Sequence, residues 1–144
     1  SVVGSQVVLT GTNSTLNVFN LTPAQLTAGE LKFVVPSTSS IIVNISGTTI
    51  NWPGKAFILP DGVTGSCKSG TSSWCHKILY NFYEATSLTL SSIGVQGSVL
   101  APYAKVNGSS GNVDGQLVCK YLIGDASFEY HPYYFNGCLL LPDP

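Results

Sequence analysis

The segments VQGSVLAPYAKV (Val95–Val106) and VDGQLVCKYLI (Val113–Ile123) repeat one pattern, and this pattern decides the fold that we expect. Each begins Val-x-Gly-x and continues with three mostly apolar residues, and a weaker copy, FNGCLLL, covers Phe135–Leu141. Short apolar strands that recur about every 20 residues, with glycine at the corners, are typical of stacked solenoid coils. An antiparallel sandwich, whose strands are also separated by glycine, is the alternative.

A solenoid coil cannot bury its apolar side alone, so equivalent residues of successive coils stack on one another. The residues expected to point inward at one such position are Val99, Leu117 and Leu139. The residues expected at one corner, where a side chain does not fit or φ is positive, are Gly97, Gly115 and Gly137. We therefore expect an all-β solenoid with coils of roughly 18–22 residues.

The rest of the chain is rich in the β-branched and aromatic residues that favour strands, with turn formers between them. Strands are predicted within Ser5–Gly11, Gly29–Pro36, Ser40–Trp52, Lys77–Phe82, Ser87–Val95, Gly97–Pro102, Gly115–Leu122 and Phe135–Leu141. One short helix is predicted over Thr22–Glu30, because Thr22 can cap it, Pro23 suits its first position and Gly29 lies near its end.

The composition indicates one domain, residues 1–144, and it excludes some classes of function. The chain has 144 residues, of which 44% are hydrophobic and 9% charged, with a net charge of −1 and no arginine. Nucleic-acid binding usually needs a Lys/Arg patch that neutralises phosphates, so we expect no nucleic-acid partner. The apolar runs are short and interrupted by polar residues, so we expect no insertion into a membrane.

The cysteines form an even set, Cys67, Cys75, Cys119 and Cys138. A zinc site is the competing interpretation, but the close Cys-x2-Cys pairs that such sites favour are missing. Disulfides are therefore preferred, and of the three possible pairings we favour Cys67–Cys75 with Cys119–Cys138. The first bridge would close the polar loop CKSGTSSWC.

The chain contains N-glycosylation sequons at Asn13, Asn20, Asn44 and Asn107. Each such triplet alone is a weak signal in a chain rich in Ser and Thr. Together with the cysteines and the low charge, they predict a secreted glycoprotein at a cell surface or in a cell wall.

Catalysis is not expected. Glycoside hydrolysis needs two carboxylates held close together, and only Asp114, Asp125 and Glu129 fall near one another on the repeat. Asp114 and Asp125 stand beside glycines, which is typical of turn residues. His131 and His76 have no nucleophile near them in the sequence. We therefore predict no catalytic, cofactor-binding or metal-binding residues and no cofactor.

Aromatic residues are the better lead, because the apolar faces of sugar rings stack on Trp and Tyr side chains. Most tyrosines in proteins are half-buried with a solvated hydroxyl, so the signal has to be weighed against ordinary packing. Other exposed platforms considered are Tyr83 and Tyr130. The residues that we select as candidate stacking platforms are Trp52, Trp74, Tyr103, Tyr133 and Tyr134. Trp74 stands out because it lies in the predicted disulfide loop.

Several segments resemble the choice-of-anchor A domain family. They are LTGTNSTLNVFNLTPAQL, SSIIVNISGTTI, ILYNFYEATSLTLSSIGVQGSVLAP and GNVDGQLVCKYLIGDASFEYHPYYF, which together cover most of the chain. The resemblance implies a right-handed parallel β-helix related to ice-binding solenoids, and a chain that forms the C-terminal portion of a longer domain. It also implies kinship with bacterial surface adhesins and with cyst-wall lectins that bind cellulose or chitin. Cys119 stands where the family tends to have Ala, and the Cys67–Cys75 loop looks like an addition.

The expected function is therefore non-catalytic extracellular adhesion or wall assembly, with a polysaccharide or surface glycan of the cellulose or chitin kind as the partner. Ice binding would need Thr residues ranked at the coil period, and the threonines do not repeat in that way. The alternative function is a self-assembling subunit of an extracellular filament or coat. An open solenoid end shows unpaired strand edges and apolar core, so it can associate head to tail with another copy.

Overall fold

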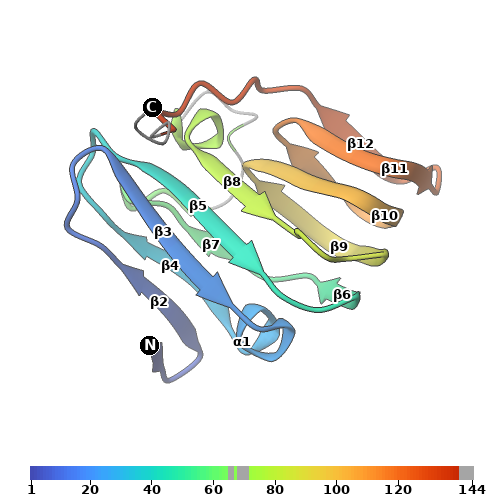
Figure 1. The fold of residues 1–144 in the computed structure, drawn as a ribbon, viewed down its shortest axis with the longest axis horizontal. Coiled ribbons are helices and arrows are strands. Elements are labelled where there is room, and N and C mark those ends of the chain that lie inside the picture. Colours follow the sequence, from blue (N-terminus) through green and yellow to red (C-terminus); the bar gives the residue numbers. More distant parts are fainter. Residues whose placement is uncertain (65–66, 68–71, 140–144) are drawn as a thin grey trace, which may run out of the picture.

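The structure of the chain is a computed structural model that describes residues 1–64, 67 and 72–139. Its strands form two sheets (Figure 1). The smaller sheet has the order β1 (Val2–Val3), β2 (Gln6–Thr10), β4 (Glu30–Val34) and β7 (Phe57–Ile58). The larger sheet has the order β3 (Leu16–Leu21), β5 (Ser40–Ile45), β8 (Ile78–Asn81), β10 (Ser98–Asp114), β9 (Ser87–Gln96) and β6 (Thr49–Pro53). β11 (Leu117–Gly124) and β12 (Phe128–His131) also pair with β10.

Almost every ladder is parallel, because each pass of the chain lays its strands on those of the previous pass. β2, β4 and β7 form one parallel stack, β3, β5, β8 and β10 form a second, and β6, β9 and β10 form a third. The exception among the paired strands is the antiparallel β1–β2 hairpin. These parallel ladders exclude the antiparallel sandwich and agree with a β-helix-like fold. The larger sheet is curled, and within the described residues the two sheets share no ladder, so a fully closed coil is not seen.

The spacing between stacked residues varies along the chain. Stacked partners are 24 residues apart at Asn20 and Asn44, 37 at Asn44 and Asn81, and 18 at Ser98 and Gln116. The predicted coil length therefore holds for the last passes and is too short for the first ones. The longest spacing belongs to the pass that contains the Cys67–Cys75 loop.

The sequence repeat is confirmed for its first two copies. Val99 pairs with Leu117 in the β10–β11 ladder, and both lie on the inner face. Gly97 has φ of +131°, and a Cβ on Gly115 would lie 2.2 Å from the Gly97 carbonyl oxygen, so the two corner glycines are stacked. This contact explains why both copies need glycine at that position.

The third copy is wrong as a strand prediction. Residues 135–139 form no strand, Leu139 is exposed, and Leu140 and Leu141 lie outside the described residues. After β12 the chain instead runs back across the starts of the parallel strands (Figure 1). The Asn136 amide donates to the His76 carbonyl and the Cys138 amide to Ser40 Oγ, so this segment is held by isolated bonds rather than by a ladder.

The core is aliphatic at its ends and aromatic at its centre. Trp52 is fully buried, with ring centroids 5.0 Å from Tyr80, 5.7 Å from Phe82 and 6.0 Å from Phe57. Edge-on contacts of this kind favour aromatic rings beyond the gain from burial. The indole Nε1 of Trp52 is buried and has no hydrogen-bond partner among the described groups.

The predicted helix is confirmed but shorter, as α1 (Pro23–Thr27). Thr22 caps it in a capping box: its hydroxyl accepts from the Gln25 amide, and the Gln25 side chain accepts from the Thr22 amide. α1 ends at Ala28, and Gly29 is already in the turn that leads to β4. Leu26 is completely buried against the core. α1 packs against β6, which belongs to the next pass of the chain.

Candidate functional site

A ladder of asparagine side chains crosses the outer face of three neighbouring strands. Asn44 Nδ2 donates to Asn20 Oδ1 over 3.1 Å, and Asn81 Nδ2 donates to Asn44 Oδ1 over 2.8 Å. The three residues are in register on β3, β5 and β8. Each amide is therefore held in a fixed orientation at the spacing between strands, about 4.8 Å.

The sequence contains a signal for this ladder in three short phrases. The phrases VFNL, IVNI and LYNF each place an asparagine between two inward-facing apolar residues, at Asn20, Asn44 and Asn81. As sequons, Asn20 and Asn44 are predicted only to carry glycans, and that prediction does not place them side by side. Their ladder would have followed from aligning the three phrases by their alternation.

One end of this ladder opens into a hollow of about 190 Å³, which we call the amide groove. It is lined by Asn20, Leu21, Thr22, Gln25, Asn44, Ser46 and Tyr83. Among the described residues its lining carries amides and hydroxyls, no Lys, Arg, His, Asp or Glu, and one exposed aromatic ring, that of Tyr83. Asn20 is exposed and lines this groove, and in the described part of the chain its Nδ2 donates to no protein group, so this donor is available to a ligand. A second hollow of about 280 Å³ continues from Asn20, Leu21 and Gln25 toward Ser1.

Two of the predicted stacking residues are wrong. Trp52 is at the centre of the core, and its burial follows from strand alternation, because it shares the inner face of β6 with Ile50. Trp74 lies in the 3-10 helix η2 (Trp74–His76), is buried, and is covered by the Lys77 ammonium 5.2 Å from its ring centroid. Neither ring has a free face for a sugar.

The other candidate tyrosines differ in exposure. Tyr103 and Tyr134 are 64% and 70% exposed, so both rings are accessible. Tyr133 is half-buried and meets the His76 ring edge-on at 5.6 Å. None of the three lines the amide groove. Tyr83, which was considered but not selected, is the aromatic residue that the fold brings to the amides.

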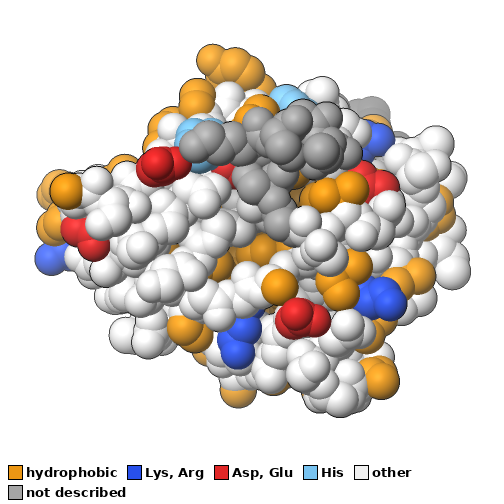
Figure 2. All heavy atoms as spheres, turned by 180° about the vertical axis from the view of Figure 1, so that it is seen from behind, with side chains coloured by type: hydrophobic (Ala, Val, Ile, Leu, Met, Phe, Trp, Pro, Cys, Tyr) orange, Lys and Arg blue, Asp and Glu red, His pale blue; other side chains and the backbone are white. Residues whose placement is uncertain are grey.

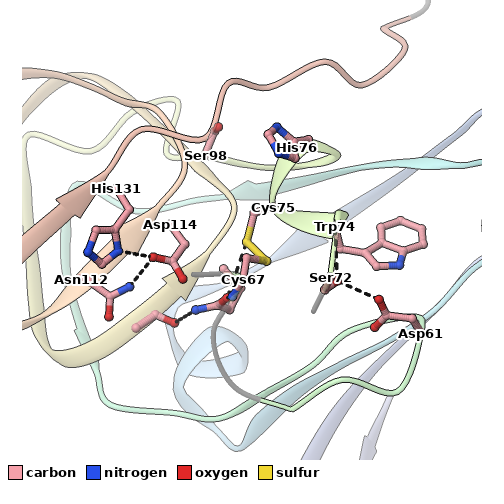
Figure 3. Close-up of a disulfide and its surroundings, with 12 residues drawn as sticks. Asp61, Cys67, Ser72, Trp74, Cys75, His76, Ser98, Asn112, Asp114 and His131 are labelled. Carbon is pink, nitrogen blue, oxygen red and sulfur yellow. Dashed lines mark hydrogen bonds and ion pairs between the residues drawn. A yellow bond between two sulfur atoms is a disulfide. The ribbon is translucent and has the colours of Figure 1, made fainter. Parts of the chain in front are cut away.

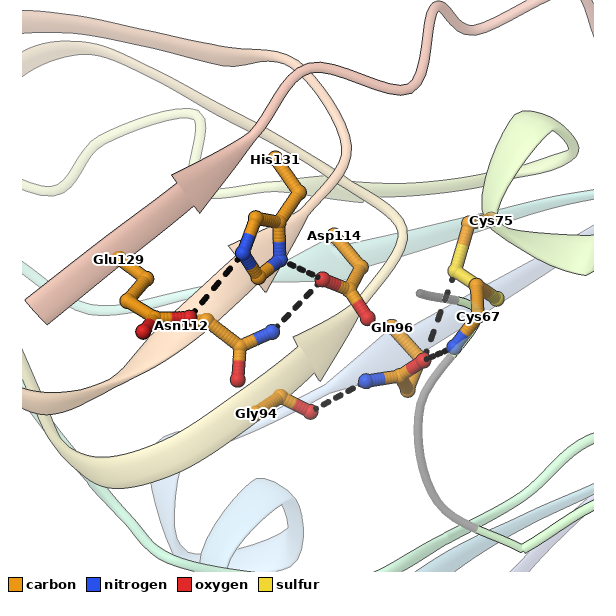
Figure 4. Close-up of polar contacts among 8 residues, drawn as sticks. All are labelled: Cys67, Cys75, Gly94, Gln96, Asn112, Asp114, Glu129 and His131. Carbon is orange, nitrogen blue, oxygen red and sulfur yellow. Dashed lines mark hydrogen bonds and ion pairs between the residues drawn. A yellow bond between two sulfur atoms is a disulfide. The ribbon is translucent and has the colours of Figure 1, made fainter. Parts of the chain in front are cut away.

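The disulfide between Cys67 and Cys75 is confirmed, with a Cα–Cα distance of 6.2 Å (Figure 3). It rules out a zinc site built from the four cysteines. Gln96 holds the buried end of the loop, since its Oε1 accepts from the Cys67 amide over 2.7 Å (Figure 4). At the surface, Ser72 donates to Asp61 over 2.7 Å.

The predicted Cys119–Cys138 bridge is not formed, and both thiols are free. Cys119 is in β11, whereas the backbone amide of Cys138 donates a hydrogen bond to Ser40 Oγ at the start of β5. β8 and β10 separate these strands, so β5 and β11 are about 14 Å apart, more than twice the reach of a disulfide. Burial raises the pKa of the Cys119 thiol.

An acid–histidine cluster joins the ends of β10 and β12 (Figure 4). His131 Nδ1 lies 2.6 Å from Asp114 Oδ1 and Nε2 lies 3.1 Å from Glu129 Oε2, while Asn112 donates to Asp114 over 2.7 Å. Asp114 is completely buried at the end of β10, so it is not the turn residue that the sequence suggested. The cluster fastens β12 to β10, and sequence alone missed it because its members stack through the ladder rather than along the chain.

Asp125 is a turn residue as predicted. Its Oδ1 accepts from the amides of Ser127 and Ser110, and these two hydrogen bonds lower the pKa of the carboxyl below its ordinary value. This turn therefore joins β11 to β12 and holds both on the end of β10. Among the described residues no group of three His, Cys, Asp or Glu could hold a metal ion.

The predicted sequons lie at different depths in the fold. Asn13 and Asn20 are exposed, whereas Asn44 and Asn107 are partly buried. Asn13 Oδ1 already accepts from the amides of Thr15 and Leu16. Glycosylation at all four positions stays a prediction.

The stack ends at β11 and β12 in a hollow of about 390 Å³ lined by Leu117, Val118, Cys119, Leu122 and Tyr130. Leu117, Cys119, Leu122 and Tyr130 pair with buried residues of β10, so on this side the hollow is the exposed last layer of the core. On the face seen in Figure 2 the charged side chains are isolated, with acids and lysines interspersed among neutral groups. No helix in the described chain is long and apolar enough to cross a membrane.

The comparisons with known proteins agree with these features at the level of the family. No curated protein and no solved structure matches the chain. One family model matches residues 2–131, and it is not the choice-of-anchor A family named from the sequence. The match spans both sheets, the Asn ladder and all strands through β12. The chain belongs to the family described as "Putative Ice-binding-like adhesive domain".

Proposed function

We propose that this chain is a non-catalytic extracellular adhesive domain that binds a neutral polysaccharide in the amide groove. The observation that carries the proposal is the combination of fixed amides with the exposed ring of Tyr83 in one hollow. Sugar hydroxyls need oriented donors and acceptors, and the Asn20–Asn44–Asn81 ladder supplies them with side chains that are already ordered. An ordered site loses less conformational entropy on binding than a mobile one.

The chemistry of the lining favours a neutral ligand. A uronic acid or sulfated sugar would need Lys or Arg near its charge, and the groove lining has neither. Glu84, next to Tyr83, accepts from the Gly47 amide over 2.6 Å, so a carboxylate stands beside the groove and would repel an anionic sugar. A cellulose-like or chitin-like chain fits these constraints.

The test is retention on crystalline cellulose and on chitin, using the wild-type chain, Tyr83→Ala and Tyr103→Ala. Both tyrosines are exposed, so neither substitution should disturb the core. Retention that is lost in Tyr83→Ala and kept in Tyr103→Ala supports the groove. Loss in Tyr103→Ala alone would move the site to the other face, and no retention of wild type on either polymer would refute polysaccharide binding.

Secretion, glycosylation and a closed right-handed β-helix complete the proposal. The Cys67–Cys75 bridge supports an oxidising compartment, where such bonds persist. The parallel ladders support the closed helix, and the family match supports kinship with surface adhesins. Mass spectrometry of the chain isolated from its host would reveal glycans at Asn13 and Asn107, the two sequons outside the amide groove, and unmodified asparagines at both would refute glycosylation.

Self-assembly into a filament or coat is a second candidate, favoured by the exposed core layer at β11 and β12. Head-to-tail stacking also needs an open first layer. Electron microscopy of the purified chain in negative stain would show rods if this candidate is right, and single particles of constant size would refute it.

A further inference from the structure

The two ends of the stack are finished differently. In the first pass the inward residues Val7 and Leu9 are only 2% and 4% exposed, and Leu26 of α1 is completely buried. β1 covers the free edge of β2, and the amino group of Ser1 donates to the Val8 carbonyl over 2.9 Å. The first layer of the core is thus covered in large part by a hairpin and a helix, at the end of the molecule that carries the N-terminus (Figure 1), and the inward Phe19 of β3 is partly buried there.

The last pass has no such cover among the described residues. Leu122 pairs in register with the fully buried Val106, and Tyr130 with the fully buried Val113, yet Leu122 is 47% and Tyr130 is 45% exposed. These side chains point inward like the residues beneath them and have no layer above them. The outer edges of β11 and β12 carry no ladder in the described chain, so their backbone groups can pair with another strand.

We infer that this end binds the same end of a second copy of the chain, so that two molecules join tail to tail about a two-fold axis. A head-to-tail contact would place the exposed layer on an end that β1 and α1 already cover, whereas two tails present matching apolar layers. An isologous contact of this kind closes on itself and gives a pair rather than a fibre.

The sequence of β11 suits antiparallel pairing with its own copy. With the axis between Lys120 and Tyr121, Cys119 lies opposite Leu122 and Val118 opposite Ile123. Cys119 and Leu122 both face the core side, because they pair with Ala101 and Val106 of β10, and Val118 and Ile123 both face outward. The β10–β11 register shifts between Cys119 and Tyr121, and the two-fold axis falls at this irregularity. The half of β11 before the shift therefore pairs with the half after the shift in the other copy.

Charge is compatible with this contact. Lys120 is the one ionised side chain on β11, and its ammonium lies 5.7 Å from the Tyr121 ring centroid. An edge lysine usually discourages pairing, so the apolar layer has to outweigh it. Asp125 and Glu129 lie at the same end, so the surface carries both signs and can match itself. The pair would present two amide grooves, which raises retention on a repeating polymer without any new contact.

The test is sedimentation of the purified chain over a range of concentrations. Wild type should form a dimer, and Leu122→Lys should raise its dissociation constant at least about tenfold, since a charge would enter the apolar contact. Val34→Lys is the matched control, because Val34 is similarly exposed on β4 of the other sheet. A monomeric wild type, a Leu122→Lys dimer as tight as wild type, or species that grow beyond a dimer would each overturn the inference.

Cross-linking tests the register. In the predicted pairing the two copies of Cys119 are about 10 Å apart along the strand, within reach of a bismaleimide. The Cys138→Ser variant should cross-link and the Cys119→Ser variant should not; a dimer that cross-links only through Cys138 would overturn the β11 contact. The inference is independent of sugar binding: Tyr83→Ala should stay dimeric, and Leu122→Lys should still bind the polymer, with weaker retention.

Discussion

Replacing Gly115 with alanine should destabilise the fold much more than replacing Gly124, although both are glycines of the last pass. A Cβ on Gly115 would lie 2.2 Å from the Gly97 carbonyl oxygen, 2.3 Å from the Gly97 carbonyl carbon and 2.6 Å from the Ser98 nitrogen. All three are backbone atoms, so no side chain can rotate away. A Cβ on Gly124 would meet only Phe128, at 3.4 Å, which is ordinary contact.

The magnitude follows from the separation that the methyl group would force. Restoring normal contact requires the two layers to move apart by about 1 Å. Hydrogen bonds hold them together at this corner: Gly97 N to the Asp114 carbonyl at 3.1 Å, Val99 N to the Gln116 carbonyl at 2.7 Å and Gln116 N to Ser98 Oγ at 3.0 Å. Weakening them at about 1 kcal/mol each, together with overpacking strain of about 1–3 kcal/mol, gives a loss of roughly 4–6 kcal/mol.

Thermal unfolding followed by circular dichroism is the assay. For a domain of this size the loss corresponds to a fall in Tm of about 12–18 °C, while Gly124→Ala should change Tm by less than about 2 °C. Neither glycine has a positive φ, so the comparison measures steric contact rather than backbone conformation. Equal melting temperatures for the two variants would refute the stacking of Gly115 on Gly97.

Other perturbations test the core, the ladder, the loop and the acid-sensitive turn. Trp52→Ala should lower the free energy of unfolding by about 3–5 kcal/mol in urea titrations, and Trp52→Phe by less, because Nε1 donates to no described group; equal losses would contradict this. Asn44→Ala removes both ladder bonds and should cost about 1–2 kcal/mol by the same titration. Replacing Cys67 and Cys75 together with serine should cost about 2–3 kcal/mol, measured against the oxidised wild type. Folding lowers the pKa of the Asp125 carboxyl below 3.8, so the ionised carboxylate stabilises the fold at neutral pH. This stabilisation is lost as the pH falls through the folded pKa. The Tm of Asp125→Asn should therefore fall less than that of wild type between about pH 5 and pH 2.

Local signals in the sequence predicted the local structure well. The helix at Pro23 follows from a capping box, which needs only neighbouring residues. Strand alternation also predicts that Trp52 is buried, since Thr49 and Asn51 are exposed whereas Ile50 and Trp52 are buried. The error on Trp52 came from selecting residues by chemical type without applying this alternation.

Other features depend on contacts that the sequence does not encode locally. The apolar phrase from Phe135 resembles the strands before it, yet its amides bond to Gln116 and His76 across the strand starts. Trp74 is buried because it packs into the hydrophobic core formed by strands of other passes. The amide groove depends on Tyr83 reaching the ladder of Asn20 and Asn44, and this requires the parallel register of separate passes.

The contrast between the two ends of the stack links the fold to adhesion. α1 and β1 cover most of the first layer, whereas Leu122 and Tyr130 in the last layer remain exposed. An exposed core layer on a monomer lowers solubility and promotes irregular association, unless one specific contact covers it. Pairing of two tails would cover that layer and would also double the number of sugar-binding grooves. If each groove binds weakly, as shallow hydroxyl-lined and amide-lined sites do, firm attachment to a polymer requires such multiplicity. On this reasoning pairing strengthens attachment through the shallow groove without being required for it: a variant that abolishes pairing should bind the polymer with weaker retention, while each groove still binds a short oligosaccharide with unchanged affinity.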